Sequence, residues 1–384
     1  MDNPRTGVET AEDRSARRAR FVETRNANAK VAREQRRGDL DRRAAGIERA
    51  VAAYRDLDPG DGTDITIRKC FVCMDPLRPP ADDNVPYRRD DDLRSRPPLT
   101  RLINRRSNAL SVYLSAVYVA HLESPAGTAV ANTHENAYGD PSWITLTGLN
   151  GQDRPKPRKA PHSDKPQLKG QRNDPRANRL RNLTRALAEL ESHGLIQAGE
   201  RTTGRFKAWS LRHEDGLGHV YEVPSPHTPY REALRVPYWF FRNGWHLVLT
   251  ATEIATLFAV IERSQALPQY QRKTGIGLPT SERWARFGLS NEAYVSAHEL
   301  HDFGVIDLVP ARVPPPGSDP VELETSRMYW PSRRLPKEPI ENRLALDVVR
   351  EDLELELPSR MYPLLFDPRD YHNSAAWTPN PPAG

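Results

Sequence analysis

The chain of 384 residues contains only two cysteines, Cys70 and Cys73. Two thiols cannot build the disulfide framework of a small secreted protein, so they indicate a reducing compartment. No run approaches the roughly 18 apolar residues that a membrane-spanning helix needs, and the polar N-terminus does not resemble a signal peptide. We therefore expect a cytoplasmic protein without a membrane partner.

Sites for metal and catalysis are also lacking. Cys70 and Cys73 have CxxC spacing, but a structural zinc site needs four ligands, and there is no second cysteine pair. Lys273-Thr274-Gly275 lacks the glycine frame of a phosphate loop. His298 and His301 lie three residues apart without the glutamate spacing of a zinc hydrolase. We expect ordinary half-buried thiols, no cofactor, no catalytic residues and no enzymatic activity.

Lysine is scarce, with 9 residues against 47 arginines, and the net charge of the chain is +5. The charge is concentrated between residues 152 and 185, where eleven basic and three acidic residues give a local net charge of +8. Such an excess favours a polyanion such as DNA through counterion release, although a solvated loop is the alternative. Candidate phosphate contacts in this loop are Lys156, Arg158 and Lys159.

The basic loop leads into Asn173–Leu211, the most informative stretch of the chain. Asp174 can cap a helix that has Pro175 at its first position, and Gly194 can end it. Leucines recur at spacings of three, four and three on one face of this helix: Leu180, Leu183, Leu187 and Leu190. The opposite face carries Asn178, Arg181, Asn182 and Arg185.

Two short strands are expected after this helix, Leu195-Ile196 and Arg205–Leu211, around the turn Arg201–Gly204. A helix with an Asn/Arg face followed by a basic hairpin is typical of the recognition helix and wing of a winged helix. Asparagine and arginine can each bond a base edge bidentately. A core helix with a solvated face is the alternative. The candidate DNA contacts are Asn178, Arg181, Asn182 and Arg185 on the helix, with Arg201, Arg205 and Lys207 on the wing.

The end of this helix is repeated 110 residues later. Residues 189–196 and 299–306 are identical at four of eight positions, which are the glutamate, leucine, glycine and isoleucine of each copy. Upstream of the second copy, Ser281–Leu289 and Ala293–Phe303 have the pattern of two helices. The repeat indicates duplication and predicts a second winged helix.

Other local patterns complete this prediction. Leu102–Leu122 is expected to be the first helix of the first winged helix, and a capping box at Thr250–Glu253 opens that of the second. Ile65–Val72 is a candidate strand, and the aromatic cluster Val236–Leu249 is expected to be buried. Val309–Trp330 is a candidate long second wing.

The expected fold is α+β but mainly α, with two tandem winged-helix domains, an Arg-rich N-terminal arm and an acidic C-terminal tail. The arm is expected to be partly helical, mobile alone, and either solvated or in contact with DNA phosphate. The tail is a candidate docking or masking element. The expected segments are the arm 1–57, an irregular linker 58–98, winged helix one with the basic loop 99–219, a Pro-rich connector 220–235, winged helix two 236–335 and the tail 336–384.

Two tandem winged helices joined by a Pro-rich connector, with the repeated Glu-Leu-x-x-x-Gly-[Leu/Val]-Ile junction, resemble bacterial plasmid replication initiators of the tandem winged-helix kind. The resemblance implies binding to double-stranded origin DNA, with host replication proteins and a second copy of the chain as further candidate partners. One departure is that Ala293–Phe303 is not basic. A transcriptional regulator and an accessory DNA-binding protein without strong sequence preference remain the alternatives.

Overall fold

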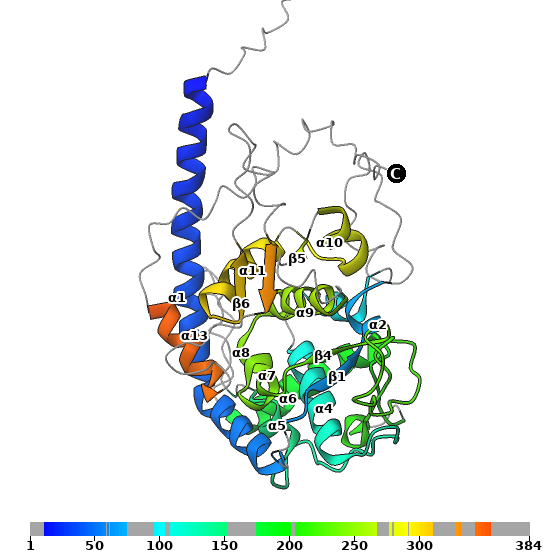
Figure 1. Ribbon diagram of the computed structural model, residues 1–384. Helices are drawn as coiled ribbons and strands as arrows, with labels where there is room; N and C mark the ends of the chain where they lie inside the picture. Colours follow the sequence, from blue (N-terminus) through cyan, green and yellow to red (C-terminus); the bar gives the residue numbers. More distant parts are fainter. Residues whose placement is uncertain are drawn as a thin grey trace, which may run out of the picture.

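The protein is mainly helical, with a few short strands (Figure 1). The computed structural model describes residues 11–58, 60, 62–74, 96–103, 108–149, 151, 174–200, 204–266, 276–278, 280–290, 292–309, 328–331 and 342–354. The buried apolar side chains of these residues form one core, which extends from Leu40 to Leu353 in the sequence. No helix in this part of the chain is long and apolar enough to cross a membrane.

The Arg-rich segment forms one helix, α1 (Ala11–Leu57), whose first turns extend beyond the other helices (Figure 1). Leu40, Ile47, Val51 and Tyr54 recur at spacings of seven, four and three, and all four are buried. The expectation of an arm that is mobile alone is therefore wrong for this half of the helix. It packs against α4 (Ala109–Glu123), α5 (Trp143–Leu146), α7 (Tyr238–Arg242), α8 (Trp245–Val248) and α13 (Ala345–Glu354).

The first half of the repeat consists of helices α4, α5 and α6 and a short hairpin. The remaining elements are α6 (Pro175–Ser192), β2 (Ile196–Gln197), a 3-10 helix η2 (Arg205–Ala208) and β3 (Ser210–Leu211). Strands β2 and β3 pair antiparallel. The expected strand Arg205–Leu211 is wrong over its first residues, which turn into η2. The expected helix Leu102–Leu122 begins only at Ala109, and Leu102 instead follows the short helix α3 (Pro98–Arg101).

The second half has a comparable order of elements. It contains α9 (Ala251–Ala266), β5 (Ile276–Gly277), α10 (Thr280–Phe287), α11 (Glu292–Asp302), β6 (Ile306–Val309) and β7 (Met328–Pro331). The three strands form an antiparallel sheet in the order β5-β7-β6. The predicted capping box is confirmed, because the Thr250 N–H donates to Glu253 Oε2 at 2.8 Å and the Glu253 N–H to Thr250 Oγ1 at 3.3 Å. Residues 310–327 of the expected wing lie outside the described residues.

The repeated junction folds in the same way in both halves. The Leu195 N–H donates to the Leu190 carbonyl at 3.0 Å, and the equivalent Val305 N–H donates to the Leu300 carbonyl at 2.8 Å. Gly194 and Gly304 have φ angles of 70° and 75°. This is the Schellman arrangement, which needs a left-handed residue after the helix and so favours glycine. A strand begins directly after each junction, at Ile196 and Ile306.

Segments that we expected to be linkers contribute a small sheet. Strand β1 (Ile65–Arg68) pairs antiparallel with β4 (Ala233–Val236), with Ile65 opposite Val236. The candidate strand Ile65–Val72 is therefore confirmed over its first half, and its second half is the short helix α2 (Lys69–Val72). Lys69 Nζ then lies 2.7 Å from Glu262 Oε1 of α9, an ion pair that ties this sheet to the second half of the repeat. The boundaries between the expected domains stay predictions.

Candidate nucleic-acid interface

Helix α6 begins and packs as its sequence predicts. The Asp174 carboxylate accepts the Arg176 N–H at 2.9 Å, which satisfies one of the free donors at the start of the helix. Leu183, Leu187 and Leu190 are fully buried, while Leu180 keeps 36% of its surface exposed. The helix is thus held against the core by its last three turns, mainly against α4.

The opposite face of α6 carries two arginines among small side chains. Arg181 and Arg185 are both exposed, and Ala177, Thr184 and Ala188 flank them on the same face. Within the part of the chain that the structure describes, neither guanidinium has a hydrogen bond or an ion pair with a carboxylate. Small neighbours let a large ligand approach the helix closely, so both guanidinium groups can reach the edges of bases.

The two asparagines differ from the arginines in their exposure. Asn178 is 4% exposed, and its Nδ2 donates to the Gly151 carbonyl at 3.0 Å. The expectation that Asn178 lies on the outer face is therefore wrong, because the loop that passes Gly151 covers this side of the helix. Asn182 is half-buried. The open face of α6 consists of Arg181 and Arg185 rather than of four alternating Asn and Arg side chains.

The wing is less basic than its sequence suggests. Arg205 makes an ion pair with Glu191 at the end of α6, and its guanidinium lies 4.6 Å from the centre of the Phe206 ring. The charge of Arg205 is thus already balanced, whereas Lys207 is exposed. Four other candidate contacts lie outside the described residues: Arg201, Lys156, Arg158 and Lys159.

Helix α11, the second copy of α6, is covered by α1. Arg33 of α1 lies 3.4 Å from Glu299, whose side chain is 16% exposed, and Arg36 lies 5.1 Å from the centre of the Phe303 ring. Burial raises the pKa of Glu299 to about 7, although Arg36 and Arg33 oppose this shift. The exposed side chains of α11 include Glu292, Val295 and Asp302, so its open surface is acidic.

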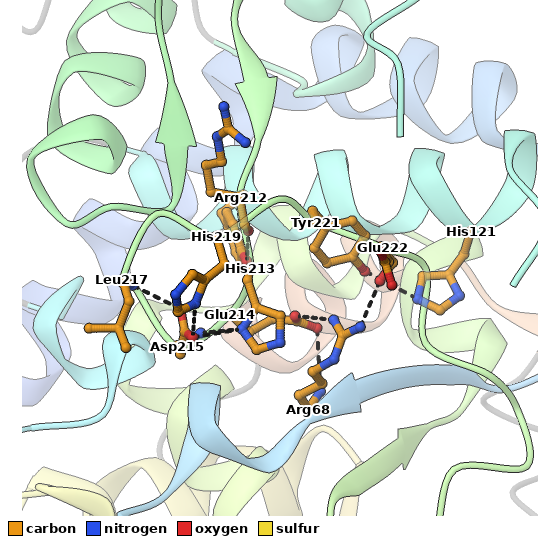
Figure 2. A network of polar contacts seen from close by, with 11 residues as sticks. Arg68, His121, Arg212, His213, Glu214, Asp215, Leu217, His219, Tyr221 and Glu222 are labelled. Atoms are coloured by element: carbon orange, nitrogen blue, oxygen red, sulfur yellow. Dashed lines mark hydrogen bonds and ion pairs between the residues drawn. The ribbon is translucent and has the colours of Figure 1, made fainter. Parts of the chain in front are cut away.

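A second polar cluster joins β1 to the loop after β3 (Figure 2). Arg68 lies 2.5 Å from the fully buried Glu214 carboxylate and donates to the Glu222 carbonyl at 2.8 Å. In the same loop, Asp215 Oδ2 lies 3.1 Å from His213 Nδ1 and 2.9 Å from His219 Nδ1. These charges balance one another, and we interpret the cluster as a structural link between the small sheet and the first half of the repeat.

The thiols lie beside this cluster. Cys70 is exposed and Cys73 buried, and both are free. Burial, followed by the charges of Glu214 and Asp215, raises the pKa of the Cys70 thiol to about 12, so its reactive thiolate is scarce at neutral pH. Among the described residues, no group of three or more His, Cys, Asp or Glu side chains could hold a metal ion. No family model, no curated protein and no solved structure matches this chain.

Proposed function

We propose that this protein binds double-stranded DNA through α6 and the β2–β3 hairpin, as the initiator of replication of a plasmid-type origin. One observation carries the proposal. The face of α6 that points away from the core presents Arg181 and Arg185 among small side chains, and the helix is followed at once by a hairpin. This is the surface that base-edge recognition in a major groove requires.

The order of elements supports the same proposal. The sequence helix, strand, helix, helix, strand, strand from α9 to β7 is the order of a winged helix, and the sheet order β5-β7-β6 fits it. The first half has three helices followed by the β2–β3 hairpin, and both halves share the Schellman junction. In this proposal the first half reads DNA, while the acidic surface of α11 serves contacts with host replication proteins or a second copy.

Binding is tested by fluorescence anisotropy with duplexes that tile the DNA flanking the gene and with a random duplex. Arg181→Ala should cost about 1–3 kcal/mol on the preferred duplex and less on the random one, because it removes one base contact. Arg231→Ala is the control, since Arg231 is also an exposed arginine but lies in the connector. Equal losses on both duplexes would limit α6 to phosphate contact, and an unaltered affinity would remove α6 from the interface.

Initiation is tested by maintenance of a plasmid that carries the gene and its flanking DNA but no other origin. Arg185→Ala should abolish maintenance by loss of binding. Glu292→Lys, on the exposed side of α11, should reduce maintenance while leaving DNA affinity intact. If no flanking DNA supports replication, yet the protein binds its own promoter and changes transcription, the protein is a regulator instead.

A further inference from the structure

Three arginines gather beside the first turns of α6, and only two of them belong to this helix. Arg176 and Arg179 lie one turn apart on α6, and Arg49 comes from α1, more than 120 residues away in the sequence. Arg49 and Arg176 are exposed, and Arg179 is half-buried. Burial and then the positive charges of Arg49 and Arg176 lower the pKa of Arg179, so the three charges repel one another across the gap between the two helices.

Little in the protein balances this charge. Within the described residues none of the three arginines makes an ion pair with a carboxylate, and Nε of Arg179 is buried without a hydrogen-bond partner. The nearest opposing charge is Asp174, which raises the pKa of Arg179 only as the last of the contributing groups. The Asp174 carboxylate is also engaged in capping the helix. A cluster of like charges of this kind is stabilised when an anion binds.

An exposed aromatic ring holds one of the arginines in place. The Arg176 guanidinium lies 4.2 Å from the centre of the Tyr138 ring and also donates to the Ala137 carbonyl. The Tyr138 side chain is 65% exposed, the second highest value among the large apolar and aromatic side chains that are exposed in the described part of the chain. A cation stacked on a ring keeps a fixed orientation while its remaining N–H groups stay available to a ligand.

We propose that Arg49, Arg176 and Arg179, with Tyr138 as a positioning residue, form a phosphate-binding site for the backbone of duplex DNA at the N-terminal end of α6. The inference rests on the proposed function, because it takes the duplex to lie across Arg181 and Arg185. These two arginines begin one turn beyond the cluster on the same helix. A strand that leaves the groove at the N-terminal end of α6 therefore carries its phosphates past the cluster.

The phosphate backbone is the partner that this chemistry fits. Guanidinium groups match phosphate oxygens in bidentate geometry, and the start of a helix adds free N–H donors and the positive end of its dipole. Such contacts carry no sequence information, so they strengthen binding to every duplex equally. The cluster would thus supply affinity and orientation, while Arg181 and Arg185 supply preference for a sequence.

The test measures the affinity of the full chain for a preferred and a random duplex at several salt concentrations. Each phosphate contact contributes about 0.9 to the slope of log K against log salt. Arg49→Gln should lower the slope by about 0.9 on both duplexes, and the triple change of Arg49, Arg176 and Arg179 to Gln by about 2–3. Arg55→Gln is the matched control, since it removes the same charge from an exposed position of α1 and should leave the slope unchanged.

Tyr138 provides a second readout. Tyr138→Phe keeps the stacked ring and should retain the wild-type slope, whereas Tyr138→Ala should weaken binding on both duplexes by freeing Arg176. Circular dichroism of each variant shows whether the fold is kept, and Arg49→Gln changes only an exposed side chain. Unchanged slopes in Arg49→Gln and the triple variant, with wild-type DNA binding intact, would refute the phosphate site alone. If the wild-type chain binds no duplex, the proposed function fails and this site fails with it.

Discussion

The bidentate ion pair between Arg36 and Glu253 gives the sharpest test of whether α1 belongs to the folded body. The two guanidinium nitrogens of Arg36 lie 2.7 and 2.8 Å from the two Glu253 oxygens. The Arg36 side chain is 17% exposed and that of Glu253 is 4% exposed. The same carboxylate accepts the Thr250 N–H in the capping box of α9. Arg36→Ala therefore leaves a buried negative charge without its cation.

Removing one partner of a buried ion pair costs about 3–5 kcal/mol, because the remaining charge stays desolvated. We expect Arg36→Ala to lower the free energy of unfolding by this amount. Adding Glu253→Gln should recover part of the loss, since glutamine carries no charge and still accepts the Thr250 N–H. Arg37→Ala is the matched control at the next residue of α1. The Arg37–Glu354 pair is 47% and 57% exposed, and such a pair contributes about 0–1 kcal/mol.

The assay is urea denaturation followed by tryptophan fluorescence, with the midpoint and the slope m compared among the four proteins. A lower midpoint at constant m reports a loss of stability rather than a change in the surface exposed on unfolding. A cost below about 1 kcal/mol for Arg36→Ala, equal to that of Arg37→Ala, would refute the reasoning. In that case α1 would be an arm that does not dock on α9.

Three further predictions concern single groups. The pKa of Glu299 is about 7 in the folded chain against 4.5, so this carboxyl stabilises the fold at low pH and loses that contribution as pH rises from 4.5 through 7. Glu299→Gln should therefore lessen the fall in urea midpoint between pH 5 and pH 8, by up to about 3 kcal/mol. Leu187→Ala should cost about 2–5 kcal/mol by opening a cavity, and Leu180→Ala, at a partly exposed position of the same helix, markedly less in the same unfolding assay. In a Cys73→Ser variant, the Cys70 thiol should react with a disulfide reagent at pH 8 about a thousandfold more slowly than free cysteine, and a comparable rate would contradict the raised pKa.

Features set by neighbouring residues could be predicted from the sequence. The Thr250–Glu253 capping box, the Asp174 cap and the Gly194 helix end all depend on groups within five residues, and each is present in the structure. The buried leucines of α6 follow from helical spacing in the same way. The repeat was also visible, because the Schellman junction needs glycine at one position and apolar side chains around it.

Features that depend on distant partners could not be predicted. Asn178 reads as an outer-face residue by helical spacing, but the carbonyl of Gly151 covers it from a loop 27 residues away. The docking of α1 depends on Glu253, more than 200 residues away. The anchors Leu40 and Ile47 did carry a signal, since their spacing marks one helix face, but the high arginine content of α1 concealed it. The Arg49 contribution to the basic cluster has no sequence signal at all.

Helix α1 also explains why two similar junctions differ in what they can bind. Both copies end in the same Schellman motif, yet Arg33 and Arg36 cover α11, whereas the exposed face of α6 stays open. The same helix then places Arg49 beside α6, where it adds positive charge. One element thus closes the acidic copy and increases the positive potential at the basic copy. A change that detached α1 would therefore weaken DNA binding at α6 and expose α11 together, which a loss of local contacts at either helix alone would not do.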